Sequence, residues 1–149
     1  MANSEQITKP GYHVVCALMA DEAGRWLCFR KGKTRFGYTS FKWEFPGGKI
    51  DAGETPRQAL SRELAEELSL DVEVGEHLMT VSHQYPDFSI VLEAFVCKCT
   101  GGTLTLTEHV EARYLGADEI LELDWCAADR PIAERLRNIA VNHSDFKKK

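Results

Sequence analysis

The sequence has little of what marks a membrane, secreted or nucleic-acid-binding protein. Its apolar runs are short, and the one around Val14 is far too short to span a bilayer. The N-terminus has no basic region followed by a long apolar run. Basic residues are outnumbered, because 18 Lys and Arg stand against 23 Asp and Glu, which gives a formal net charge of −5. We therefore expect a cytoplasmic protein with no membrane partner and no stable nucleic-acid complex, while a local basic site is still compatible with this charge.

The cysteines show no metal-binding or disulfide spacing. The five cysteines are odd in number, lack a C-x-x-C pair and lie mostly within apolar runs, which predicts reduced thiols packed in the core. The chain also has no internal repeat and no low-complexity linker. We expect residues 1–149 to form one domain with its own core, as a monomer or homodimer, with loose polar tails at 1–10 and 143–149.

Short apolar segments alternate with helical patterns along the chain. The predicted strands cover 12–20, 25–31, the short segment before the first glycine pair, 72–84, 88–99 and 111–115. The first two should form a hairpin through the turn at 21–24, and 72–84 should pair with 88–99 across 85–87. Helices are expected after Thr55, over 117–123 and over 129–141. This order predicts an α+β fold, a mixed sheet with helices packed against it.

The segment 43–70 is the most informative part of the sequence. It reads as a strand, a glycine-rich loop and a helix capped by Thr55, with Pro56 at the first helical position. Leucines at 60, 64 and 68 form one apolar stripe. The neighbouring face carries three carboxylates at positions i, i+3 and i+4: Glu63, Glu66 and Glu67. An acidic face alone is typical of a solvated helix, but carboxylates crowded behind a glycine loop suit Mg²⁺ or Mn²⁺.

This segment resembles the Nudix box, which is a glycine, five residues, Glu, seven residues and then Arg-Glu-apolar-x-Glu-Glu-x-Gly-apolar. The matching residues are Gly48, Glu54, Arg62, Glu63, Leu64, Glu66, Glu67 and Leu70. Ser69 replaces the last glycine of the box, which normally leaves the helix in a left-handed conformation, so the exit of the helix is left open. Membership of the Nudix family implies an α/β/α sandwich.

The resemblance implies a divalent-metal site. The glutamates 63, 66 and 67 would bind Mg²⁺, with Mn²⁺ as a substitute, and the Gly47 carbonyl would add a ligand. Glu54 and Arg62 would hold the carboxylates in register. Glu63 is our choice for the residue that takes the proton from water. In the MutT-like branch a glutamate before a late strand completes the metal shell, which points to Glu108, with Glu111 as the alternative.

The MutT-like likeness extends to the substrate contacts, through segments such as WEFPGGKI and HQYPDFSIVLEAF. Arg30, Lys31 and Lys49 would bind phosphates, or else are ordinary surface cations. Asp129 stands where the oxidised-guanine enzyme carries Asn. An ionised Asp only accepts hydrogen bonds, which favours an amino-bearing base such as cytosine, methylcytosine or adenine; alternatively Asp129 caps the last helix. Trp43, expected at the rim of the loop, and Tyr85 would stack on the base.

The function implied is metal-dependent hydrolysis of a nucleoside triphosphate to the monophosphate and pyrophosphate. Rival substrates are dinucleoside polyphosphates, nucleotide sugars and the triphosphate end of RNA. A non-catalytic nucleotide-binding Nudix domain is the alternative of another class, and it is disfavoured because every box glutamate is present. Histidines at 13, 83 and 109 show no paired metal spacing and carry no assignment.

Overall fold

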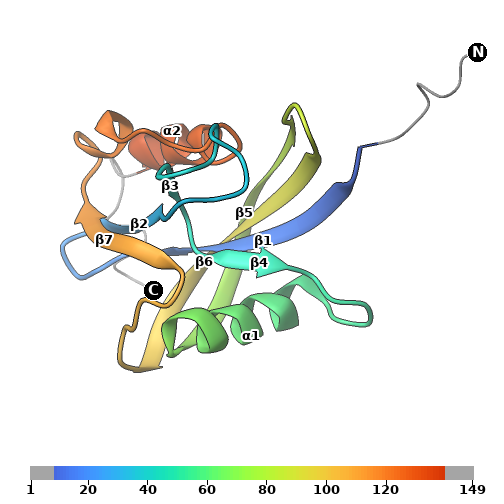
Figure 1. Ribbon diagram of the computed structural model, residues 1–149. Coiled ribbons are helices and arrows are strands. Elements are labelled where there is room, and N and C mark those ends of the chain that lie inside the picture. Colours follow the sequence, from blue (N-terminus) through green and yellow to red (C-terminus); the bar gives the residue numbers. More distant parts are fainter. Residues whose placement is uncertain (1–8, 140–149) are drawn as a thin grey trace, which may run out of the picture.

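A computed structural model describes residues 9–139 of the chain (Figure 1). Its elements are β1 (Gly11–Met19), β2 (Trp26–Lys31), β3 (Trp43–Glu44), β4 (Gly47–Lys49), α1 (Pro56–Leu68), β5 (Leu70–Gln84), β6 (Ser89–Gly102), β7 (His109–Leu115), the 3₁₀ helix η2 (Ile120–Glu122) and α2 (Arg130–Ile139). The predicted tails, apart from residues 9–10, and the last two residues of the predicted helix 129–141 fall outside the described range.

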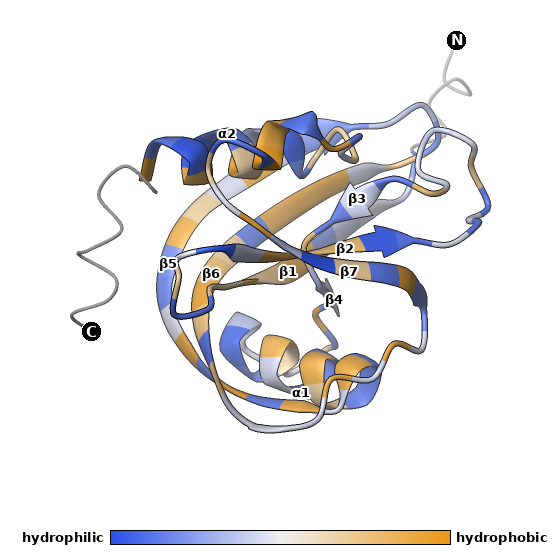
Figure 2. Cartoon of the chain, turned by 90° about the vertical axis from the view of Figure 1, so that its left-hand side faces the viewer, coloured by the Kyte–Doolittle hydropathy of each residue, from blue (hydrophilic) through white to orange (hydrophobic). Residues whose placement is uncertain are grey.

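The strands form two sheets that lie between the two helices. One sheet has the order β4-β1-β6-β5 and the other β3-β2-β7. β1 runs parallel to β6, whereas the other pairs are antiparallel, so the first sheet is mixed. In Figure 2, α2 lies above the strands and α1 below them. The predicted α+β fold with a mixed sheet between helices is confirmed, and it is divided into two sheets.

The alternation of side chains along β1 divides the core into two layers. Val15 and Ala17 pack with the leucine stripe of α1, whereas Cys16 and Leu18 pack toward α2 on the other face. All of them are buried, as a central strand covered on both faces requires. The described cysteines are all free, and only Cys99 is exposed, in agreement with the predicted packed thiols.

Three local predictions were wrong. The expected hairpin of 12–20 with 25–31 does not form, because β1 uses both of its edges for β4 and β6, and only a single bridge joins Ala20 to Trp26. Part of the predicted glycine loop is the short strand β4, which pairs with β1. The predicted helix over 117–123 is reduced to the 3₁₀ turn η2.

Helix α1 begins and ends as its sequence requires. Thr55 accepts the Gln58 N–H and the Gln58 side chain accepts the Thr55 N–H, which forms a reciprocal capping box. At the other end Ser69 adopts the left-handed conformation, with φ 58°. The helix therefore keeps the exit of a Nudix box although serine replaces glycine there. No helix within residues 9–139 is long and apolar enough to cross a membrane.

Candidate active site

Two glycines hold the strand-to-helix segment against its neighbours at distances that no side chain permits. A Cβ on Gly47 would lie 1.8 Å from the Val15 carbonyl oxygen of β1, so only glycine allows the pairing of β4 with β1. A Cβ on Gly48 would lie 2.3 Å from Cδ of Glu63, the first box glutamate of α1. The Gly48 backbone is therefore the surface against which the Glu63 carboxylate rests.

Arg62 organises the acidic face of α1. Its guanidinium donates to both oxygens of Glu54, at 2.6 and 2.9 Å, and to the Lys49 carbonyl at 3.1 Å, which ties the helix to the glycine loop. It also donates to Glu63 at 3.0 Å and to Glu66 at 3.2 Å. The hydrogen bond from Arg62 lowers the pKa of Glu54. The predicted positioning pair, Glu54 and Arg62, is thus brought together beside the predicted metal ligands.

Glu67 is the box glutamate with the strongest electrostatic perturbation. Burial, a hydrogen bond with Glu63 and the charges of Glu108, Glu63 and Glu44 raise the pKa of Glu67 to about 9. The residues that cause this shift are carboxylates from α1, from β3 and from the loop before β7. The predicted ligand Glu108 therefore lies within electrostatic reach of the box.

The loop before β7 is fastened to the C-terminal end of α1. The Thr105 N–H donates to the Leu68 carbonyl at 2.9 Å, and the Thr107 hydroxyl donates to the Glu67 carbonyl at 2.9 Å. Both bonds satisfy carbonyls that a helix end leaves without a partner. They also explain why Glu108, far from the box in sequence, faces it. The alternative, Glu111, instead pairs with Arg113 at 2.6 Å.

An open cavity of about 210 Å³ lies between these carboxylates and the start of the segment that links β2 to β3. It is lined by Lys31, Gly32, Lys33, Thr34, Glu44, Glu108 and His109. Burial lowers the pKa of Lys31, but the charges of Glu44, Cys126 and Asp129 and a hydrogen bond with Glu44 together outweigh it, so the pKa is raised and this ammonium stays charged. The cavity is thus lined by both basic residues and carboxylates.

Only one of the three predicted phosphate-binding residues lines this cavity. Lys31 does so, and Lys33, which the sequence did not single out, joins it. Arg30 donates to the Phe41 carbonyl at 2.9 Å and lies 3.8 Å from Glu111. The Lys49 ammonium lies over the Tyr12 ring, 4.1 Å from its centroid. The side chains of Arg30 and Lys49 thus make other contacts, and phosphate binding by these two residues stays a prediction.

Glu44 is the residue that the sequence reasoning missed. It accepts a hydrogen bond from the almost fully buried His109 at 2.9 Å and lies 3.6 Å from the Lys31 ammonium. His109 itself packs against Phe29, and its Nδ1 has no hydrogen-bond partner among the described residues. A signal was present, because a charged residue between Trp43 and Phe45 in an apolar strand must face away from both.

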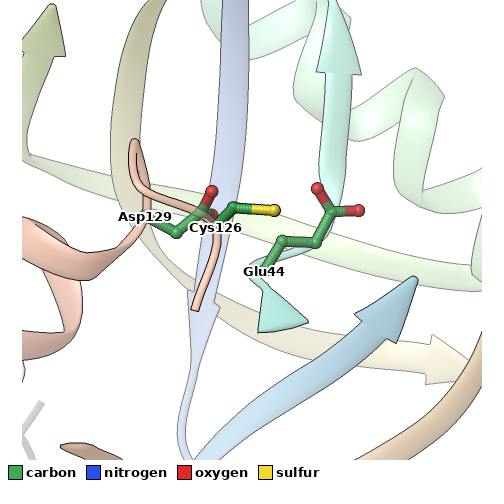
Figure 3. A group of neighbouring side chains, drawn as sticks. All are labelled: Glu44, Cys126 and Asp129. Atoms are coloured by element: carbon green, nitrogen blue, oxygen red, sulfur yellow. The ribbon is translucent and has the colours of Figure 1, made fainter. Parts of the chain in front are cut away.

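Glu44 also meets two residues of the segment before α2 (Figure 3). Ligand atoms of Glu44, Cys126 and Asp129 all lie within 4.8 Å of one another. The Asp129 carboxylate accepts the Phe45 N–H at 3.0 Å, across 84 positions of sequence, rather than a helix N–H of the described chain. Burial, followed by the charge of Glu44, raises the pKa of Asp129 well above its ordinary value. The shift favours the neutral carboxyl group, which donates as well as accepts, over the ionised form, which only accepts.

The two predicted base-stacking aromatics are buried. Trp43 is 6% exposed and does not lie at the rim of the loop; its backbone accepts the Cys126 N–H and donates to Asp124. Tyr85 is also 6% exposed, and its hydroxyl accepts the Ala128 N–H at 3.0 Å. Both residues form hydrogen bonds with the 124–128 segment and help to hold Asp129 beside β3. Because their rings are buried, they are not free to stack on a base.

The acidic cluster fits a divalent cation. Glu63 rests on a cradle that a Cβ at Gly48 would fill, and the like charges around Glu67 are unfavourable unless a cation is gathered among them. Oxygen donors of this kind suit Mg²⁺ or Mn²⁺. Arg62 donates hydrogen bonds to Glu63 and Glu66, so these carboxylates are turned toward the guanidinium. Within residues 9–139, the only group of three potential metal ligands whose atoms lie within 4.8 Å of one another is Glu44, Cys126 and Asp129.

Comparisons with known proteins agree with this geometry. A sequence model of the NUDIX domain matches residues 10–136. An 8-oxo-dGTP diphosphatase of Proteus vulgaris is 54% identical over 54 residues, which cover 36% of this chain and about half, 48%, of that protein. The CTP pyrophosphohydrolase of Escherichia coli is 37% identical over 62% of this chain and 68% of its own length. A MutT protein from Methanosarcina mazei superposes with a TM-score of 0.77 at 25% identity, over 89% of this chain and 96% of that one.

Proposed function

Because the chain belongs to the Nudix family, we propose that it is a divalent-metal-dependent pyrophosphohydrolase that converts a nucleoside triphosphate to the monophosphate and pyrophosphate. The observation that carries this proposal is the cavity that Glu108 and Glu44 line together with Lys31 and Lys33. A polyphosphate needs both kinds of residue, because it is itself anionic and is hydrolysed at a site that also holds cations.

The metal would be held by Glu63, Glu66, Glu67 and Glu108, with the Gly47 carbonyl. When bound, a divalent cation neutralises the charge of the phosphoanhydride and makes water a better nucleophile. Mg²⁺ is the expected ion and Mn²⁺ the expected substitute.

The protein residues have separate roles in this proposal. Glu63 accepts the proton of the attacking water, and Arg62 together with the Gly48 backbone fixes where its carboxylate lies. Lys31 and Lys33, which line the cavity, bind phosphate oxygens. These residues hold and orient the substrate while a single proton moves to Glu63.

Asp129 is the proposed base-reading residue. Burial raises its pKa, and in the neutral form the carboxyl group presents one donor and one acceptor, as the side chain of Asn does. Two base classes fit such a pair, amino-bearing pyrimidines such as cytosine and oxidised guanine. Both classes occur among the names of the relatives, one of which is a CTP pyrophosphohydrolase and another an 8-oxo-dGTP diphosphatase.

Pyrophosphate release with Mg²⁺ tests the proposal, over CTP, dCTP, dGTP and 8-oxo-dGTP. Glu67→Gln should lower turnover by at least about a hundredfold, since it removes a proposed ligand and leaves the fold intact. Glu76→Gln, an exposed acid of β5, serves as the matched control. Tight nucleotide binding with no release would instead identify a non-catalytic Nudix domain. A silent panel followed by cleavage of dinucleoside polyphosphates or nucleotide sugars would refute the substrate class and leave the hydrolase.

Asp129→Asn tests the base reader in the same assay. If Asp129 is protonated, Asn reproduces its donor and acceptor and still accepts the Phe45 N–H, so the order of preference among bases should be unchanged. A preference that moves from cytosine toward oxidised guanine would show that Asp129 acts as an ionised acceptor. Asp129→Ala should weaken discrimination by about tenfold or more, because the pocket then leaves polar groups of the base unpaired.

A further inference from the structure

We propose that Glu44, Cys126 and Asp129 form a second metal site, for Zn²⁺ or a similar thiophilic ion, where β3 meets the segment before α2. It is separate from the glutamates of the box. Its occupant competes with the nucleotide base for Asp129. Binding of the ion stands on the geometry alone, whereas the competition rests on the proposed function.

The three ligands come from two segments that the backbone holds together. Glu44 belongs to β3, while Cys126 and Asp129 belong to the segment before α2. The Cys126 N–H donates to the Trp43 carbonyl at 2.9 Å, and the Phe45 N–H donates to the Asp129 carboxylate at 3.0 Å. The ligand atoms, one from each side chain, lie within 4.8 Å of one another, and Figure 3 shows the Cys126 sulfur pointing toward Glu44.

The Cys126 side chain is buried and its sulfur points toward Glu44 (Figure 3). The residue is 3% exposed, and no hydrogen bond among residues 9–139 uses its sulfur. The buried thiols of Cys28 and Cys97, by contrast, donate to the carbonyls of Trp26 and Phe95. A buried thiol that points toward a carboxylate, with a second carboxyl group within 4.8 Å, is placed to act as a metal ligand.

The donor set selects a different metal from the box. Cysteine sulfur with carboxylate oxygens is a combination that Zn²⁺ accepts, and thiolate ligands favour softer ions over Mg²⁺. The box offers only oxygen and therefore suits Mg²⁺. Two ions can thus occupy the molecule at once without exchanging places.

Binding of the ion would require two of the three ligands to lose a proton. Burial and the charges of Asp129 and Glu44 raise the pKa of Cys126, which opposes this loss. The ion binds the thiolate, and the thiol proton, with that of Asp129, passes to solvent. The Lys31 ammonium, 3.6 Å from Glu44, is the cation that the cluster attracts in the apo protein. A metal ion would take over that role.

Cobalt absorption tests the site directly, with Mg²⁺ in excess so that the box is filled. Co²⁺ added to the wild-type protein should give a thiolate-to-cobalt charge-transfer band, and Zn²⁺ should remove it by displacement. Cys126→Ser should abolish the band and weaken Zn²⁺ binding by at least about tenfold. Cys99→Ser, at the exposed cysteine outside the cluster, should retain both. Absence of the band in the wild type, or its persistence in Cys126→Ser, overturns the proposal.

Competition has its own readout. A nucleotide that the protein hydrolyses should displace Co²⁺ and remove the band, and Zn²⁺ should raise KM for that nucleotide while leaving kcat unchanged. If Zn²⁺ lowers kcat in the wild type and in Cys126→Ser by the same factor, the proposed competition is overturned, because Zn²⁺ then acts at the box glutamates. If no nucleotide is hydrolysed, the proposed function fails while the cobalt band still decides the metal site.

Discussion

Replacing Gly48 by alanine isolates the geometry of one carboxylate. Gly48 is not one of the glycines with positive φ, so alanine fits its backbone conformation. The three atoms nearest to the new Cβ all belong to the Glu63 carboxyl group, with Cδ at 2.3 Å. Ordinary contacts begin at 3.4 Å, so the carboxyl group must move by about 1 Å. The backbone need not move, because the obstacle is the end of a flexible side chain.

A displacement of this size is expected to lower kcat/KM by about a hundredfold, or about 2.7 kcal/mol of transition-state stabilisation. The free energy of unfolding should change by less than about 1 kcal/mol. Pyrophosphate release with saturating Mg²⁺ measures the first quantity and urea denaturation the second. Gly37→Ala is the matched control, since a Cβ at Gly37 meets nothing within 4 Å. Gly48→Ala activity within threefold of the wild type would refute the reasoning that the position of Glu63 limits catalysis.

Three further changes test neighbouring features. Ser69→Gly relieves a left-handed residue, which costs about 1–2 kcal/mol, against about 0.4–1 kcal/mol of added chain entropy. Urea denaturation should therefore show a stabilisation of about 0.5 kcal/mol, absent from Ser69→Ala; a loss of stability would contradict it. Arg62→Lys cannot reproduce the forked contact with Glu54 and should cost about 10–100-fold in activity, with a higher Mg²⁺ requirement. An unchanged Mg²⁺ dependence of the rate would contradict this role. Without divalent ions, the raised pKa of Glu67 means that the folded protein holds an extra proton between pH 4.5 and 9, so its stability falls as pH rises through that window. Glu67→Gln should flatten the plot of melting temperature against pH in that window. If the plots of the wild type and of Glu67→Gln run parallel in the presence of a chelator, the raised pKa of Glu67 is contradicted.

Features set by local sequence were predicted correctly. The cap at Thr55, the leucine stripe of α1 and the hairpin of β5 with β6 depend on residues close together in the chain. The same holds for the three box glutamates, since helical spacing alone places them on one face. The Nudix resemblance added Glu108, whose distance from the box no local pattern bridges.

The remaining errors concern contacts between distant segments. The parallel pairing of β1 with β6 left no edge for the expected hairpin with β2. The sequence did not distinguish the two adjacent basic residues of β2 as phosphate-binding candidates, yet Lys31 lines the cavity and Arg30 does not. Adjacent side chains of a strand point to opposite faces, and only the packing of β2 against distant segments decides which face borders the cavity.

The role of Glu44 depended on contacts of the same long-range kind. Its partner His109 is 65 positions away, and Cys126 and Asp129 are farther still. The local pattern around Glu44 indicates which way its side chain points, but it does not identify these partners. Only the packing of the segment before α2 onto β3 brings their side chains together.

The parallel pairing of β1 with β6 also has a kinetic consequence. Gly11 pairs with Ser89 and Met19 with Cys97, so β1 can complete its pairing only after β6 is available. Such distant pairings make folding slow, because the intervening chain must be ordered before the contact stabilises it. During synthesis, β1 therefore emerges with an apolar surface long before its partner exists. The glycine segment that supports Glu63 pairs with that same strand, so the hydrolytic site can be completed only after β6 has been made.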